Sequence, residues 1–179
     1  MKTDNDNIDK KIKLRLVAVN NVAKDNILIL DCYHGFGVLW GNVQKHTEKK
    51  IKVIGIEKEW GKGDAAFHGD NEKFLPSIDL SIYDIIDLDA YGIPFDQLEI
   101  LFQRKYRGIV VCTFIQSIFG NLPGDFLSKL GYTEKMFNKI KSIFTKNSFD
   151  KLKNYLYLYG IEELMFYKCQ RKLYFYFKI

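Results

Sequence analysis

Three short apolar runs in this chain each end in acidic residues, and this pattern constrains the fold more than any other feature. The runs cover residues 27–31, 53–57 and 83–89, and a further acid, Asp70, follows a glycine in a predicted loop. Unbroken apolar runs of this length are typical of strands buried on both faces of a parallel sheet. We therefore expect the acids to line up along one edge of that sheet, where such folds bind ligands.

Predicted helices alternate with predicted strands along the chain. Helices are expected at 8–19, 38–46, 71–75, 94–104, 133–144 and 149–159, and strands at 27–31, 52–57, 83–87, 108–115, 163–169 and 172–179. Alternation of this kind predicts an α/β fold with a parallel sheet and right-handed crossovers. The last two strands flank residues 170–171 and predict an antiparallel hairpin, with one antiparallel strand at an edge of the sheet.

The predicted helix at 133–144 carries an apolar stripe that we expect to be buried, with Thr133 as its N-cap. The stripe consists of Met136, Phe137, Ile140, Ile143 and Phe144. A turn is expected at residues 121–124, before this helix.

The length of 179 residues favours one domain over residues 1–179, with residues 1–7 unstructured. The three cysteines and three histidines have no metal-ligand or disulfide spacing. No apolar run is long enough to span a bilayer, and the polar start of the chain does not resemble a signal peptide. We therefore expect a cytoplasmic protein with no metal site and no membrane association; the oligomeric state is not indicated.

The net charge of +5 is unevenly distributed. From Lys129 onward the chain holds 11 Lys and Arg against 4 Asp and Glu. A basic C-terminal third suits a polyanionic partner such as RNA or DNA. The alternative is a lysine-rich helix face that contacts only water.

The segment at residues 31–37 joins the first buried strand to a helix. Gly35 and Gly37 let the backbone approach a ligand closely, and phosphate binding at the helix N-terminus is one use of such a turn. A dinucleotide-binding fingerprint needs a third glycine at position 40. Trp40 stands there, which disfavours a nicotinamide-dependent oxidoreductase.

The acids after the next strands suit a nucleoside ligand. Glu57 ends the second strand, where a carboxylate can accept both hydroxyls of a ribose. Asp70 could accept a hydrogen bond from an adenine amino group. Asp87 and Asp89 share one face of the third strand because side chains alternate along a strand, and Tyr91 follows in a tight turn.

The segment 31–37, with the sequence Asp-Cys-Tyr-His-Gly-Phe-Gly, resembles the first motif of class I S-adenosylmethionine-dependent methyltransferases, D-x-F/Y-x-G-x-G. The resemblance covers roughly residues 27–120. It implies a three-layer Rossmann-like methyltransferase fold with a mostly parallel seven-stranded sheet and a C-terminal antiparallel hairpin. It also implies S-adenosylmethionine as the cofactor. The residues that would bind it are Asp31, Tyr33, Gly35, Gly37, Glu57, Asp70, Asn71 and Asp87.

Residues 87–92, Asp-Leu-Asp-Ala-Tyr-Gly, resemble the D-L-D-P-F-G motif of tRNA guanine N2-methyltransferases and, more loosely, the D-P-P-Y motif of amino-methylating enzymes. The resemblance implies Asp87, Asp89 and Tyr91 as catalytic residues. Asp89 would hold the acceptor amine and Tyr91 would pack on the base. Ala90 departs from the motif, which has proline there.

The resemblance implies methyl transfer to an amino group of a nucleic-acid base, with RNA favoured over DNA. One alternative is a subunit that binds the cofactor without turnover, or a nucleic-acid-binding module. Another is an aminopropyltransferase-like enzyme, although its polyamine substrate would be repelled by the basic C-terminal third.

Overall fold

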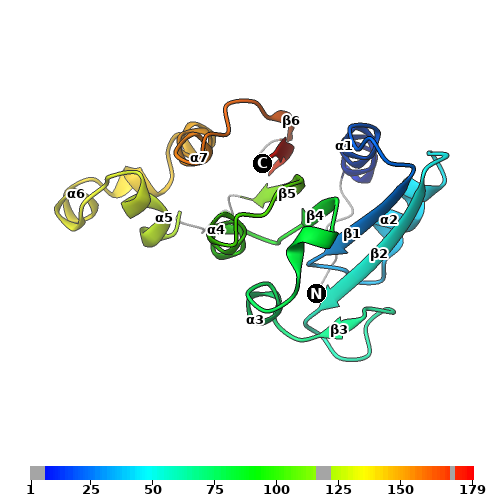
Figure 1. Cartoon of the computed structure of the whole chain (residues 1–179). Coiled ribbons are helices and arrows are strands. Elements are labelled where there is room, and N and C mark those ends of the chain that lie inside the picture. The colour runs from blue at the N-terminus through cyan, green and yellow to red at the C-terminus, as the bar shows by residue number, and fades with distance from the viewer. Residues whose placement is uncertain (1–6, 116–121, 170–171) are drawn as a thin grey trace.

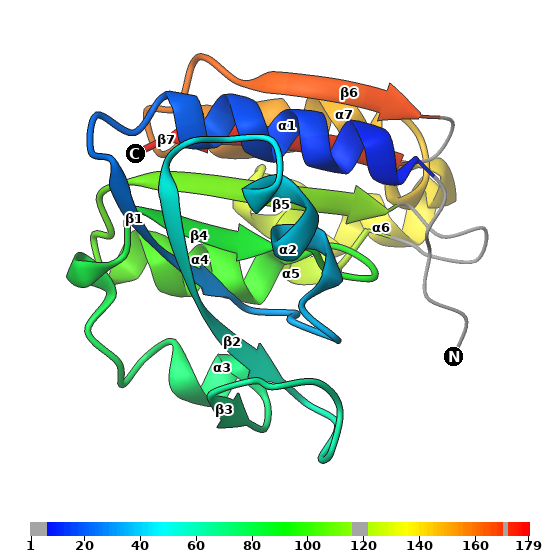
Figure 2. The ribbon, with the colours of Figure 1, turned by 90° about the vertical axis from the view of Figure 1, so that its right-hand side faces the viewer.

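A mixed sheet forms the centre of the protein in the computed structural model, which describes residues 7–115, 122–169 and 172–179 (Figure 1). Its strand order is β3-β2-β1-β4-β5-β7-β6. The strands are β1 (Asn26–Asp31), β2 (Lys50–Glu57), β3 (Phe67–His68), β4 (Ile85–Leu88), β5 (Ile109–Ile115), β6 (Met165–Cys169) and β7 (Lys172–Lys178). Pairing is parallel from β3 to β5, and β7 runs antiparallel to both β5 and β6 (Figure 2). The prediction of a mostly parallel seven-stranded sheet is confirmed.

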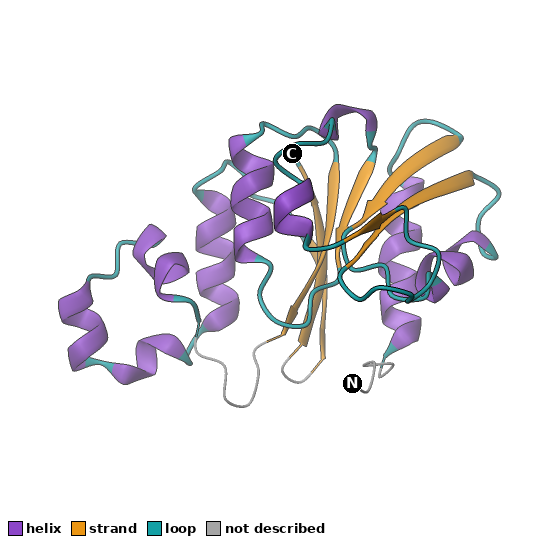
Figure 3. Cartoon of the chain, turned by 90° about the horizontal axis from the view of Figure 1, so that it is seen from below, coloured by secondary structure: helices purple, strands orange, loops and turns teal. Residues whose placement is uncertain are grey.

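Helices pack on both faces of this sheet and give three layers (Figure 3). Two helices, α1 (Ile8–Asn20) and α2 (Val38–Gln44), cover one face. The other side carries α3 (Asn71–Phe74), α4 (Phe95–Gln103), α5 (Gly124–Lys129), α6 (Glu134–Lys139) and α7 (Ser148–Tyr157), with the 3-10 helices η1 (Leu80–Ile82) and η2 (Lys141–Phe144).

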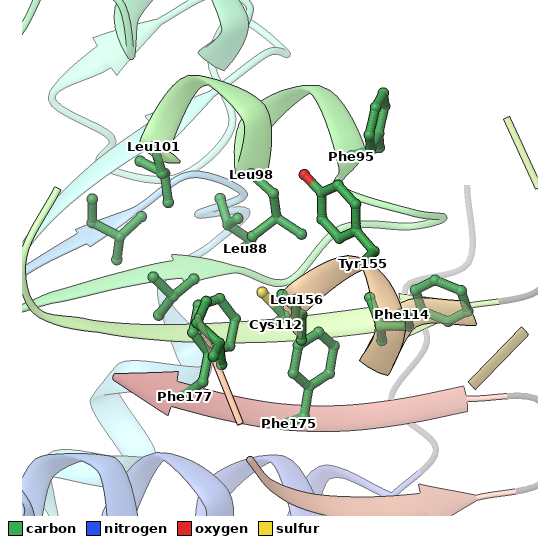
Figure 4. Close-up of a cluster of buried hydrophobic side chains, with 14 of the residues drawn as sticks. Leu88, Phe95, Leu98, Leu101, Cys112, Phe114, Tyr155, Leu156, Phe175 and Phe177 are labelled. Carbon is green, nitrogen blue, oxygen red and sulfur yellow. The ribbon is translucent and has the colours of Figure 1, made fainter. Parts of the chain in front are cut away.

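Each face of the sheet has its own hydrophobic core. On the α4 and α7 side, Leu98, Tyr155 and Leu156 pack with Phe175 and Phe177 of β7 (Figure 4). On the opposite face, residues of α1 and α2 pack against β1, β4 and β5; they include Leu14, Ala18, Trp40 and Val43. A continuously apolar strand can be buried on both faces, which is why β1, β4 and β5 were readable from the sequence.

Strand register places the acidic strand ends side by side. Asp31 pairs with Gly55 of β2 on one side and with Asp87 of β4 on the other. The backbone N–H of Cys32 donates to the carbonyl of Asp87 at 3.0 Å, which extends the pairing beyond the end of β1. The carboxyl ends of β1, β2 and β4 therefore meet at one edge of the sheet.

Thr133 is confirmed as an N-cap and Ile143 is buried, but the predicted helix at 133–144 is wrong in its length and its apolar stripe is buried only in part. The chain breaks at Ile140, with φ −126° and ψ 83°, between α6 and η2. Met136 and Ile140 are exposed, and no residue of α6 is buried. Phe137 and Phe144 pack together with ring centroids 5.2 Å apart. On a continuous helix they would be separated by about 10.5 Å of rise, so this contact requires the break.

Other details differ from the sequence prediction. The edge strand is β6, not the antiparallel β7, because β7 pairs with β5 along seven residues. The two-residue β3 lies in a segment where no strand was predicted, and α5 was not predicted. The hairpin residues 170–171, the first residue of the predicted turn at 121–124 and residues 1–6 lie outside the described residues.

The helices in the described part of the chain are all too short or too polar to cross a membrane.

Candidate functional site

A cavity of about 600 Å³ opens at the carboxyl edge of the sheet. Because the strand order is β2-β1-β4, Glu57 lies on one side of Asp31 and Asp89 lies on the other. Lys11 and Ile8 of α1 also line the cavity, at the Asp89 side of the sheet. The cavity therefore extends across three strand ends and reaches the first helix.

Most of the residues predicted from the sequence lie together in this cavity. Those that line it are Asp31, Tyr33, Gly35, Glu57, Asp70, Asn71, Asp89 and Tyr91. Gly37 and Asp87 do not line it. Gly37 instead precedes α2 with φ 68°, and Asp87 is fully buried.

The Glu57 carboxylate is held against the turn that follows β1. One oxygen accepts from the backbone N–H of Gly35 at 2.7 Å, and the other accepts from that of Glu59 at 3.0 Å. A carboxylate has about four acceptor positions, so two remain available for a ligand hydroxyl. The turn itself is crossed by the loop that follows β2, because a Cβ at Gly63 would clash with the carbonyl of Gly35.

His34 links this turn to two acids. The sequence analysis did not predict this link. Its Nδ1 lies 3.2 Å from Asp31, and its Nε2 lies 3.0 Å from Asp64. The hydrogen bond with Asp31, followed by that with Asp64, raises the pKa of His34 to about 9 despite partial burial. The ring packs on Gly55, where a Cβ would clash with it. A glycine within the apolar run of β2 was the one sequence signal for this packing.

Asp70 and Asn71 shape the far side of the cavity. Asp70 caps α3 by accepting from the backbone N–H of Glu72, and its other oxygen pairs with Lys58 at 3.0 Å. The hydrogen bond with Lys58 lowers the pKa of Asp70. The Asn71 side chain donates to the carbonyl of Cys32 at 2.8 Å, which ties α3 to the end of β1.

Asp87 is the centre of a buried polar cluster rather than a cavity residue. Arg15 of α1 donates to its two oxygens at 2.7 and 2.8 Å, and the indole N–H of Trp40 donates at 2.9 Å. Burial raises the pKa of Asp87 to about 7, against the opposing attraction of Arg15. The cluster joins α1, α2 and β4.

Asp89 also pairs with α1, but on the cavity side. Lys11 Nζ lies 2.9 and 3.0 Å from its two carboxylate oxygens, and the Thr113 hydroxyl donates to one of them. Burial opposes ionisation of Asp89. The charges of Arg15 and Lys11 nevertheless hold its pKa below the usual value. Tyr91, by contrast, is 69% exposed at the cavity.

Lys11, Arg15, Trp40 and Thr113 were not predicted as site residues. The sequence signal for the first two was their spacing of four residues in a predicted helix, which places them on one face. Within the described residues, no three His, Cys, Asp or Glu side chains are grouped so that they could hold a metal ion.

No protein-family model matches the chain, and no curated protein matches its sequence. Solved structures resemble it in fold. A proposed haemolysin from Streptococcus thermophilus matches with a TM-score of 0.58 and 11% identity, covering 99% of this chain and 68% of that protein. A proposed methyltransferase from Escherichia coli matches with a TM-score of 0.55 and 12% identity, covering 95% of this chain and 84% of that protein.

A proposed class I S-adenosylmethionine-dependent methyltransferase from Listeria monocytogenes matches with a TM-score of 0.53 and 14% identity. The match covers 96% of this chain but 59% of the Listeria protein. At these identities the likeness concerns the fold alone. The chain has the Rossmann-like fold of S-adenosylmethionine-dependent methyltransferases.

Proposed function

We propose that the protein is an S-adenosylmethionine-dependent methyltransferase that acts on an amino group of a nucleic-acid base, RNA rather than DNA. The observation that carries the proposal is the alignment of Asp31, Glu57 and Asp89 along one cavity at the carboxyl edge of the sheet. Open α/β sheets bind ligands at this edge. A cavity of about 600 Å³ is also within the range of small-molecule sites.

The chemistry of the cavity fits this cofactor. S-Adenosylmethionine carries a ribose diol, an adenine amine and a positively charged sulfonium, and each is complemented by a carboxylate. Glu57 would accept from the ribose hydroxyls with the acceptor positions that its backbone partners leave available. Asp70 would accept from the adenine amine, and Asp31 would contribute negative charge between Glu57 and Asp89.

When bound, the sulfonium supplies a methyl group that is already activated for transfer. The residues of the protein then mainly have to align the acceptor amine with that group. Asp89 would orient an amine and stabilise the positive charge that develops on it. Tyr91, which is largely exposed at the cavity, would pack against the acceptor ring.

The RNA target is supported by the exposed lysines that follow α5. Lys135, Lys139, Lys141 and Lys146 are exposed, and Glu134 is the one acid among residues 132–149. α6 lies at the outer end of the molecule in Figure 1, away from the strands of the sheet. Exposed cations of this kind would contact phosphates, so RNA affinity should fall steeply as salt rises.

The first test is calorimetric titration of the full chain with S-adenosylmethionine and S-adenosylhomocysteine, with NAD as a control. We expect micromolar binding of the first two and none of NAD. Glu57→Ala should weaken binding by about tenfold or more, equal to about 1.4 kcal/mol. Glu162→Ala, which changes an exposed acid in the segment between α7 and β6, is the matched control. Unchanged affinity in Glu57→Ala would remove Glu57 from the site.

The substrate is tested separately with a single-stranded RNA in a filter-binding assay at several salt concentrations. The triple variant Lys135→Gln, Lys139→Gln and Lys141→Gln should bind more weakly and with a shallower salt dependence. Replacing Lys45, Lys50 and Lys52, which are exposed at the opposite edge of the sheet, is the control. Equal losses of RNA affinity in both triple variants, or an RNA affinity that does not change with salt, would contradict an RNA substrate.

A further inference from the structure

Lys11 occupies the position on Asp89 that the proposed function assigns to the acceptor amine. Its Nζ lies 2.9 and 3.0 Å from the two carboxylate oxygens, so the ammonium is shared between both. The Lys11 side chain is 12% exposed and that of Asp89 is 15% exposed. An external amine that made the same two contacts with Asp89 would therefore have to displace Lys11.

A neighbouring ion pair also attaches α1 to the sheet. Arg15 lies one helical turn after Lys11, pairs with Asp87 and lies 3.6 Å from an Asp89 oxygen, and the side chains of Arg15 and Asp87 are each 1% exposed. Neither lines the cavity, whereas Lys11 and Asp89 both do. Arg15 thus pins the helix to β4 from within the core. Lys11 presents a primary amine inside the cavity, together with Asp31, Tyr33 and Gly35.

We propose that Lys11 Nζ is itself a methyl acceptor, and that each chain methylates its own Lys11 unless another amine displaces it from Asp89. This inference rests on the proposed function, because it requires S-adenosylmethionine in the same cavity. It adds a modification site and a reaction in cis that the resemblance to methyltransferases does not imply.

The transfer balances without a further reactant. Lys11 first gives up one proton to solvent through the open cavity, so that Nζ has a lone pair. The lone pair of Nζ then forms a bond to the methyl carbon as the carbon–sulfur bond breaks. The sulfur keeps that electron pair and becomes a neutral thioether. Lys11 becomes a methylammonium, whose charge Asp89 stabilises.

The experiment incubates the full chain with S-adenosylmethionine carrying a deuterated methyl group and locates the label by mass spectrometry. Cleavage before aspartate gives the peptide of residues 9–24, which contains Lys10, Lys11, Lys13 and Lys24. We expect one labelled methyl on Lys11 and about tenfold less on Lys10 or Lys13. The fraction labelled at a given time should not depend on protein concentration, because the reaction is in cis.

Two variants separate the role of Lys11 from its contribution to folding. Lys11→Arg keeps a cation on Asp89 and should abolish the label on residue 11. Asp89→Asn keeps the shape of the side chain but weakens its hold on the ammonium, and should lower the label about tenfold.

Amine acylation without the cofactor provides a readout that does not depend on turnover. In the native chain Lys11 should react more slowly than the exposed Lys13, and in Asp89→Asn this difference should shrink.

The outcomes distinguish this inference from the proposed function. Binding of S-adenosylmethionine with no label on Lys11, or with equal label on Lys10, Lys11 and Lys13, overturns the inference and leaves the proposed function standing. Absence of S-adenosylmethionine binding in calorimetry overturns both.

Discussion

Arg15→Met should strongly destabilise the protein. The Arg15 side chain is 1% exposed, donates twice to Asp87 at 2.7 and 2.8 Å, and also donates to the carbonyl of Lys11 at 3.2 Å. Methionine fills similar space but leaves Asp87 buried with only the Trp40 N–H as a partner. Removing one member of a buried ion pair costs about 3–5 kcal/mol, whereas the whole stability of a typical domain is about 5–15 kcal/mol.

Urea unfolding followed by circular dichroism measures this cost. The slope of the unfolding free energy against urea concentration should be unchanged. Lys24→Met is the matched control, because Lys24 is 67% exposed where it pairs with Asp84 and should contribute less than about 1 kcal/mol. Adding Asp87→Asn to Arg15→Met should restore part of the loss, since no buried charge then remains. A loss below about 1 kcal/mol in Arg15→Met would refute the idea that this pair pins α1 to β4.

The stability lost in Arg15→Met should depend on pH in a defined direction. Burial already raises the pKa of Asp87 to about 7, and without the attraction of Arg15 it should rise further. An acid whose folded pKa is raised contributes stability that is complete below its unfolded pKa of about 3.9 and is lost as pH rises through the folded value. The destabilisation by Arg15→Met should therefore be smaller at pH 5 than at pH 8. An equal loss at both values would contradict burial as the cause.

Three further predictions concern the turn after β1 and the opposite helical layer. The pKa of His34 is raised to about 9. The stability that His34 contributes is therefore complete below pH 6.5 and is lost as pH rises through about 9. Thermal melts should show this decline in the native chain but not in His34→Asn. Gly55→Ala should cost about 1–3 kcal/mol in urea unfolding, because the new Cβ meets the His34 ring, and a change near zero would contradict this packing. Tyr155→Phe should cost about 1–2 kcal/mol in the same assay, because the buried hydroxyl donates to Glu99 at 2.7 Å; an unchanged midpoint would mean that this bond contributes nothing.

The strands and the cavity-facing acids were predictable because their information is local. β1, β4 and β5 are apolar runs buried on both faces, and the end of each run can be recognised from the sequence alone. Once the sheet is parallel, the strand ends must meet at one edge, so Asp31, Glu57 and Asp89 come together without any knowledge of tertiary contacts. β3 has only two residues, and its pairing depends on where β2 lies.

The partners of those acids were not predictable, because each comes from a distant part of the chain. Lys11 and Asp89 are 78 residues apart in sequence, and Arg15 and Asp87 are 72 apart. The helix predicted at 8–19 is confirmed by α1, but the sequence did not indicate that an arginine of this helix would be buried. Charged residues are rarely buried unless paired, and the pairing becomes visible only in three dimensions.

Trp40 has a structural role that the sequence prediction did not include. Its bulk at the third glycine position argued against a dinucleotide site, which needs close approach of the backbone there. In the structure the indole is 2% exposed and donates to Asp87, while the Arg15 guanidinium lies 5.7 Å from its ring. A glycine at this position would remove a partner of the buried acid and open a cavity beside Arg15. The third glycine of a dinucleotide site is therefore incompatible with the contacts that attach α1, and this reason lies outside the turn itself.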